Sequence, residues 1–236
     1  MNLIKKYTPE SLNDLVIPNQ NVRDLFEDIV NGLSSDRYLY LVGTQGAQKS
    51  TFANMLPKLI EGFDPHVNII NGFDKLDIEK ALAQIRNINI FGGISGQKYQ
   101  YVIFEEIDKV ENNLSLFWQE MDTFNSNIFV IATSNSLMST DKSVRSRFKV
   151  VEMEPITSKT FLPRAIEILS SEGIDLNHQY ILDELKDMDS LNDIRKYMNV
   201  LCDIERDHLA GRIPDHAYGS TPIKQSKPKL TVLSSK

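Results

Sequence analysis

Five short apolar runs, separated by stretches with helical periodicity, constrain the fold of this 236-residue chain. Most of these runs are continuously apolar, as expected for parallel strands that are buried on both faces of a sheet. Their alternation with helices is typical of an α/β domain whose parallel sheet carries helices on its faces. The predicted strands cover residues 38–43, 67–71, 101–105, 128–133 and 148–153.

The spacing of apolar residues predicts helices between these strands and again after them. Beyond residue 155 only helical periods remain, which indicates a small all-helical domain over residues 156–210 after an α/β domain over residues 1–155. Residues 211–236 have three prolines and no sustained period, so we expect a flexible basic tail there. The predicted helices cover residues 20–32, 49–60, 75–88, 113–124, 158–171, 177–187 and 191–209.

Composition narrows the class of protein further. The hydrophobic and charged fractions, 41% and 25%, are those of a soluble globular protein, and no apolar run reaches the ~20 residues of a membrane span. A single cysteine and the lack of an apolar leader predict a cytoplasmic protein, and the four histidines show no metal-ligand spacing. A net charge of −6 argues against indiscriminate coating of nucleic acid, so any DNA contact would be local or shared among subunits.

The stretch LVGTQGAQKST, residues 41–51, follows a predicted strand and leads into a predicted helix. Backbone N–H groups at such a helix start bind phosphate, Lys49 would reach the β- and γ-phosphates, and the Ser50 hydroxyl would bind Mg²⁺. The stretch departs from the phosphate-loop pattern GxxxxGK[ST] at Gln48, where the pattern has glycine. Because glycine supplies positive φ and room for phosphate, the alternative interpretation is a polar turn that contains a lysine by chance.

Polar residues follow or precede three more of the predicted strands. Glu105 and Glu106 end the strand YVIFE, where one acid can hold Mg²⁺ through water and the next can polarise the attacking water. Asn135 follows another strand and could bind a γ-phosphate or that water, while Arg145 and Arg147 precede the last strand and suit a phosphate's charge. Singly, such acids or a turn asparagine are ordinary surface features. Their order along one chain favours a nucleotide site.

In this order the motifs resemble those of the AAA+ ATPase subunits of sliding-clamp loaders, particularly the small-subunit and phage types. KYTPESLNDLVIP looks like the family's N-terminal box, GTQGAQKST looks like the Walker A loop and FEEID looks like Walker B. Asn135 matches sensor 1, and the triplet SRF at 146–148 resembles the SRC motif. SLNDIRKYMNVL is similar to the family's lid sequence and puts Arg195 at sensor 2.

The resemblance extends from about Lys6 to about Leu201 and implies a fold, cofactors and roles. The implied sheet order is 5-1-4-3-2, with the helical domain as a lid over ATP and Mg²⁺. The implied catalytic residues are Glu106, which orients water, Asn135, and Arg147, which acts on a neighbouring subunit's ATP. The implied Mg²⁺-binding residues are Ser50 and Glu105. The implied ATP-binding residues are Tyr7, Val16, Ile17, Gly43, Thr44, Gln45, Gly46, Ala47, Gln48, Lys49, Ser50, Thr51 and Arg195.

The resemblance also implies partners: other clamp-loader subunits in a homo- or hetero-oligomer, a sliding clamp and primer-template DNA, with no membrane. Four features depart from the family pattern, namely Gln48 for glycine, Glu105 for aspartate, Phe148 for cysteine, and a basic tail where the family has a helical collar. They leave three interpretations open: an ATPase that is active, slow or impaired, a catalytically degenerate scaffold in a replication assembly, or another AAA+ role such as a helicase loader. The tail is either solvated or docks a partner or DNA.

Overall fold

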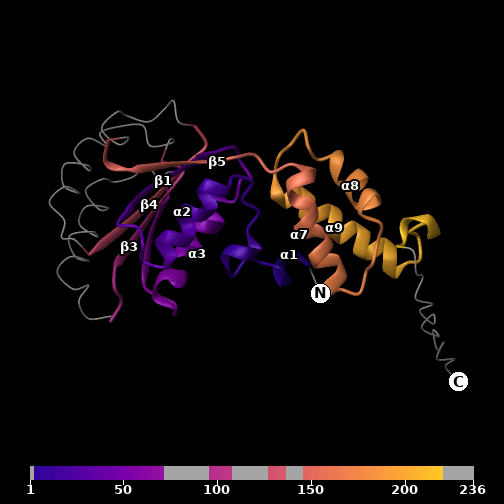
Figure 1. Cartoon of the computed structure of the whole chain (residues 1–236), viewed down its shortest axis with the longest axis horizontal. Coiled ribbons are helices and arrows are strands. Elements are labelled where there is room, and N and C mark those ends of the chain that lie inside the picture. Colours follow the sequence, from indigo (N-terminus) through magenta and orange to yellow (C-terminus); the bar gives the residue numbers. More distant parts are fainter. Residues whose placement is uncertain (1–2, 72–95, 108–126, 137–145, 220–236) are drawn as a thin grey trace, which may run out of the picture.

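The computed structural model describes residues 3–71, 96–107, 127–136 and 146–219. These residues form an elongated molecule with a sheet domain at one end and a helical domain at the other (Figure 1). The helices predicted at residues 75–88 and 113–124 lie outside the described residues. Within the described ranges, no helix combines the length and apolarity needed to cross a membrane.

The sheet has five parallel strands in the order β2-β3-β4-β1-β5, which confirms the predicted order. β1 and β4 lie next to each other inside the sheet, and nearly all their side chains are buried. This burial on both faces explains why their sequences are continuous apolar runs without polar alternation. The strands are β1 (Tyr38–Gly43), β2 (Val67–Asn71), β3 (Gln100–Glu105), β4 (Ile128–Ser134) and β5 (Lys149–Met153).

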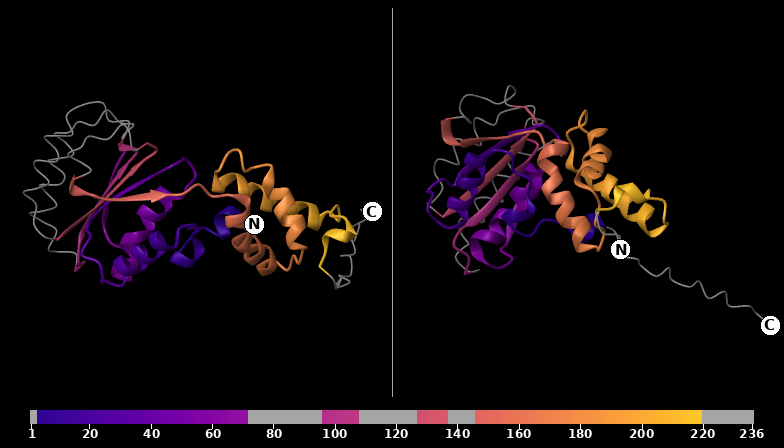
Figure 2. Two further views of the ribbon diagram at one scale, coloured as in Figure 1. Left: turned by 45° about the horizontal axis from the view of Figure 1, so that its top comes forward. Right: turned by 45° about the vertical axis from the view of Figure 1, so that its right-hand side comes forward.

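Helices α2 (Gln20–Val30) and α3 (Lys49–Glu61) lie together on one side of the sheet (Figures 1 and 2). Their contact is centred on Phe26 and Phe52, whose rings stack with centroids 3.6 Å apart. Both rings are buried in the apolar cluster that also contains the inward side chains of β1. This packing holds the start of α3 directly behind the end of β1, which is the arrangement a phosphate loop requires.

The helical domain, called the lid below, contains α7 (Ser158–Ser171), α8 (His178–Lys186) and α9 (Ile194–Leu209). It has its own core, in which Phe161 and Tyr197 stack with centroids 5.3 Å apart. α9 begins at Ile194 and not at the predicted residue 191 because Asp193 caps it, its carboxylate accepting from the Arg195 backbone N–H at 3.0 Å.

The lid continues beyond residue 210, where the sequence predicts the start of a flexible tail. Ile213 and Ala217 are buried in the lid core, and Tyr218 forms an isolated antiparallel bridge with Leu176. The short 3-10 helix η4 (Asp215–Ala217) places these residues. The sequence pattern does not predict these contacts, because isolated apolar residues without a period give no helical signal.

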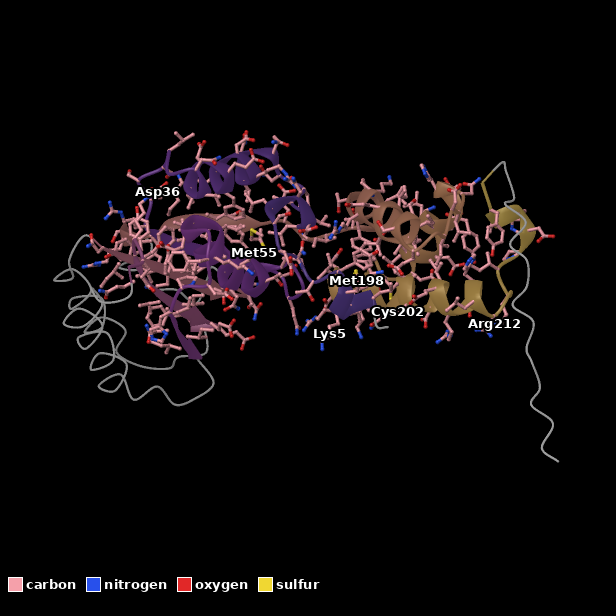
Figure 3. The ribbon with its side chains drawn as sticks, turned by 90° about the horizontal axis from the view of Figure 1, so that it is seen from below. Lys5, Asp36, Met55, Met198, Cys202 and Arg212 are labelled. Atoms are coloured by element: carbon pink, nitrogen blue, oxygen red, sulfur yellow. The ribbon has the colours of Figure 1, made fainter. Side chains whose placement is uncertain are left out.

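Residues 3–19, called the strap below, contact both the sheet domain and the lid. Within the strap are α1 (Leu3–Lys6) and the 3-10 helix η1 (Leu12–Asp14). Leu3 is buried in the lid core, and α1 runs along α9 near Met198 and Cys202 (Figure 3). Leu15, by contrast, is buried in the sheet-domain core. The lid partners lie more than 100 residues away in the chain, which no local pattern reveals.

Candidate functional site

A cavity of about 190 Å³ opens at the carboxyl end of β1, between the sheet domain and the lid. Three parts of the chain line it: the loop and first turn of α3, the ends of β3 and β4, and the start of α9. Carboxyl ends of parallel strands are where ligands of open α/β sheets bind. The lining residues are Gln45, Gly46, Gln48, Lys49, Ser50, Thr51, Glu106, Thr133, Ser134, Asn135, Ile194 and Arg195.

Lys49 lines this cavity and is only 7% exposed. Its ammonium donates to the backbone oxygens of Gly43 and Thr44, at 2.8 and 2.7 Å, and to the Asn135 Oδ1 atom at 3.0 Å. These three acceptors are neutral oxygens. A lysine ammonium beside the start of a helix favours an anionic ligand. The structure therefore brings together two residues that the sequence predicts in the same site.

The two acids at the end of β3, Glu105 and Glu106, have different surroundings. Glu106 lines the cavity in the left-handed region (φ +54°), and its backbone N–H donates to the Thr133 Oγ1 atom at 3.1 Å. Glu105 is not among the lining residues, and its Oε1 atom accepts from the Asn54 amide at 3.2 Å. Asn54 also donates to the Ser50 backbone oxygen at 2.9 Å. Glu105 is therefore linked to the start of α3 through Asn54, whereas Glu106 faces the cavity itself.

Gln48 adopts a left-handed backbone conformation, with φ +62° and ψ +16°. Its side chain is 7% exposed, and its Oε1 atom accepts from the backbone N–H of Val16 in the strap at 2.9 Å. The conformation is one that glycine adopts without cost and that other residues adopt rarely. A glutamine is accommodated here because its amide is hydrogen-bonded to the strap.

The lid contacts the loop through Asp193, a residue that the sequence analysis does not single out. The Ile194 backbone N–H donates to the Gly46 backbone oxygen at 3.4 Å. Arg195 donates to the Asp193 carboxylate through Nε and Nη2, at 2.9 and 2.6 Å. Arg195 thus borders the cavity as predicted, but it is paired with a neighbouring acid. The available signal was an Asp just before a helical period, which is a frequent N-cap.

Substituting Gly46 tests this contact, because a β-carbon there would lie 2.5 Å from both Cα and Oδ1 of Asp193. Gly46 also has φ +82°, as Gly62 has φ +76°, but nothing lies within 4 Å of a β-carbon at Gly62. We expect Gly62→Ala to cost about 1–2 kcal/mol of unfolding free energy, the torsional cost alone. Gly46→Ala should cost at least about 1 kcal/mol more, since the lid must move. Equal losses of unfolding free energy in the two variants, measured by urea unfolding, would contradict the contact between Gly46 and Asp193.

The Asp193–Arg195 pair also predicts a dependence on pH. Hydrogen bonds from the Arg195 guanidinium hold the pKa of the Asp193 carboxyl below its usual range, against an opposing effect of burial. The ionised carboxylate therefore stabilises the folded chain above the usual carboxyl pKa, and this stabilisation is lost as pH falls through the lowered value. Asp193→Asn keeps a capping side chain but cannot ionise. In unfolding titrations, its unfolding free energy should therefore fall less than that of the wild type below pH ~4, by up to about 1 kcal/mol. If the unfolding free energy of Asp193→Asn and of the wild type depended on acid pH in the same way, the result would contradict this effect of the pair.

The remaining predicted ATP-binding residues lie in two other places. Val16, Ile17 and Ala47 line a depression behind the loop, beside Met153, that leaves no room for a water molecule. Tyr7 packs against the lid core, and its hydroxyl donates to Glu172. Thr44 contributes its backbone oxygen to the Lys49 ammonium. The structure thus brings the loop residues together with sensor positions, but not with Tyr7.

Arg147 lies at the opposite end of the sheet from the loop. It precedes β5, whose first residue Lys149 pairs with Leu39 near the start of β1. At about 3.3 Å per residue along β1, the loop is roughly 15–20 Å away. The next residue, Phe148, is buried and packs edge-on against Tyr38 and Tyr40. Arg145 lies outside the described residues.

The chain thus combines a five-stranded parallel sheet, a loop-to-helix junction at the end of β1 and a helical lid. Residues 39–155 match the family model of the ATPase family associated with various cellular activities (AAA). The match covers just under half of the chain.

Among curated proteins, the chain is similar to subunits of clamp loaders, which confirms the resemblance predicted from its motifs. It is 24% identical over 189 residues to the sliding-clamp-loader large subunit of Escherichia phage RB69, covering 74% of this chain and 55% of that protein. It is 25% identical over 206 residues to the replication factor C small subunit of Picrophilus torridus, covering 84% of this chain and 62% of that protein. The chain thus spans a little over half the length of these relatives.

Among solved structures, the chain is similar to the Thermotoga maritima RuvB Holliday junction branch migration motor. The TM-score is 0.65 at 16% identity, with 87% of this chain and 67% of that chain covered. A variant of the same protein gives a TM-score of 0.67 at 15% identity, with 90% and 70% covered. At this identity the likeness concerns the fold alone.

Proposed function

We propose that this chain binds ATP with Mg²⁺ in the cavity at the end of β1 and works as an ATPase subunit of a clamp-loader-like assembly. In that role it would join other subunits in the cytoplasm to load a sliding clamp on primer-template DNA. The observation that carries the proposal is the convergence of Lys49, Asn135 and Glu106 around one loop, with Arg195 above them on the lid. The similarity to two clamp-loader subunits supports the assignment to a replication assembly.

The residues around the loop fit a triphosphate. The ammonium of Lys49 lies beside the backbone oxygens of the loop, and α3 begins directly at this residue. Lys49 would turn from the loop oxygens to the β- and γ-phosphates, beside backbone N–H groups at the start of α3. The Ser50 hydroxyl and, through water, Glu105 would hold Mg²⁺, which would supply positive charge against the triphosphate. Arg195 would exchange Asp193 for a phosphate oxygen.

For hydrolysis, Glu106 and Asn135 would orient the attacking water from the two neighbouring strand ends. Arg147 is too far from the loop of its own chain to contribute there, which favours an action on the ATP of an adjacent subunit. A guanidinium supplied in this way stabilises charge that develops on the transferred phosphoryl group. Hydrolysis would then depend on assembly.

This dependence gives the test of the proposal. The purified chain alone should hydrolyse ATP slowly, because no arginine completes its site, and adding companion subunits, the clamp and primed DNA should stimulate turnover at least tenfold. Steady-state phosphate release measures both conditions, with unprimed duplex DNA as the control. Brisk hydrolysis by a proven monomer, or no stimulation by any of these partners, would contradict the proposal.

A second candidate is a scaffold subunit that no longer depends on ATP. It is favoured by one observation: the Lys49 donors are satisfied by the protein itself, while Asp193 lies against Gly46, where added atoms would clash. A scaffold would assemble with its partners equally well whether or not Lys49 is present. Comparison of assembly by the wild type and Lys49→Ala, with and without ATP, separates the two functions.

A further inference from the structure

Three non-glycine residues among those the structure describes have positive φ, and two of them line the cavity. Glu106 and Gln48 line it, and Asn192 immediately precedes Asp193 on the lid. Backbone strain of this kind persists only where the surroundings impose it, and it concentrates at functional positions. Of the three, Gln48 stands where the loop pattern has glycine, and its buried amide has a defined partner in the strap.

That partner belongs to the part of the strap that joins the two domains. The Val16 side chain is buried in the lid core, and Leu15 beside it is buried in the sheet-domain core. One residue earlier, the Asp14 carboxylate pairs with Arg164 on α7 of the lid, with the two atoms 2.7 Å apart. A movement of residues 14–16 is therefore transmitted to the lid through packing and through an ion pair.

The other end of the contact belongs to the phosphate loop. Gln48 is the N-cap residue of α3, its backbone oxygen accepts from the Phe52 N–H at 2.9 Å, and it directly precedes Lys49. Its backbone torsions set the direction of its side chain toward the strap. The Val16 N–H is buried, so it needs an acceptor, and Gln48 Oε1 is the one that the structure gives it.

We propose that Gln48 is a positioning residue that ties the strap to the phosphate loop, so that the lid follows the state of the loop. This role rests on the proposed function, because the change in the loop would come from ATP. A glycine would relieve the torsional strain at this position but would leave the Val16 N–H without its acceptor. On this proposal, Gln48 in place of glycine couples the phosphate loop to the strap and does not indicate a loop that has lost its function.

Two substitutions of similar length isolate the hydrogen bond. Gln48→Met and Gln48→Glu both keep a β-carbon in the left-handed region, but only glutamate keeps an oxygen that can accept from Val16. In the full chain without nucleotide, the Val16 amide should exchange with solvent at least about tenfold faster in Gln48→Met and within about threefold of the wild type in Gln48→Glu. The Val130 amide, bonded to Arg37 in the sheet domain, is the control for global stability.

The second measurement adds Mg-ATP at saturation and follows exchange at residues 194–201 of the lid. The wild type should show slower exchange there, and Gln48→Met should show less than about a third of that slowing. Equal Val16 exchange in Gln48→Met and the wild type, or an equal lid response with ATP bound to both, would overturn this role while leaving the proposed function intact. Failure of the wild type to bind Mg-ATP would remove the proposed function and this role together.

Discussion

Replacing Lys49 by alanine is expected to weaken Mg-ATP binding at least about 100-fold. Charge-assisted hydrogen bonds to phosphate contribute about 1.5–3 kcal/mol each, and Lys49 has the donors for two of them once it leaves the loop oxygens. The fold should survive, because the substitution removes a buried charge and leaves neutral oxygens at the rim of an open cavity. Fluorescence titration with labelled ATP measures the affinity.

The control for this prediction is Lys58→Ala, which removes an exposed lysine from the last turn of the same helix. Its affinity for Mg-ATP should stay within about twofold of the wild type, because surface charges more than a Debye length away are screened. If Lys49→Ala bound ATP as tightly as Lys58→Ala, the phosphates would not lie at the start of α3. The scaffold interpretation would then gain support.

Replacing Arg147 by alanine is expected to lower ATP hydrolysis by the complete assembly about 10³-fold, while the substituted chain still binds ATP. Arginines supplied in trans accelerate phosphoryl transfer by this order, and the position of Arg147 at the far end of the sheet excludes a direct contact with its own loop. Single-turnover hydrolysis in the assembled complex measures the rate, and labelled ATP measures the binding.

Lys149→Ala provides the matched control, since Lys149 is an exposed cation two residues further along, at the start of β5. Its rate should remain within about threefold of the wild type. Equal rates for the two variants would exclude Arg147 as the group that completes a neighbouring site. A loss of ATP binding by the isolated Arg147→Ala chain would point instead to a structural defect near the buried ring of Phe148.

The strands of the sheet domain could be predicted from sequence because contiguous apolar residues specify each of them. The continuous apolar runs predicted all five strands to within a residue, and the resemblance of the motifs to a known family supplied their order. Lys49 and Asn135 could be placed together because each follows one of two neighbouring strands, and the carboxyl ends of parallel strands share one edge.

The contacts between distant segments could not be predicted in the same way. The amide of Gln48 bonds to Val16, 32 residues earlier, and the glutamine therefore looked like a defect of the loop and not like a contact. Asp193 reaches Gly46 only because the lid folds back over the loop. Nothing in the local pattern of the strap reveals that Leu3 packs on helices more than 150 residues away.

The most direct measurement is a titration of the wild-type chain with labelled ATP and Mg²⁺, carried out alone and with its companion subunits. We expect saturable binding of one ATP per chain, which excess unlabelled ATP displaces and which Lys49→Ala weakens at least about 100-fold. Absence of saturable binding under both conditions would contradict the proposed function, and only the fold would remain.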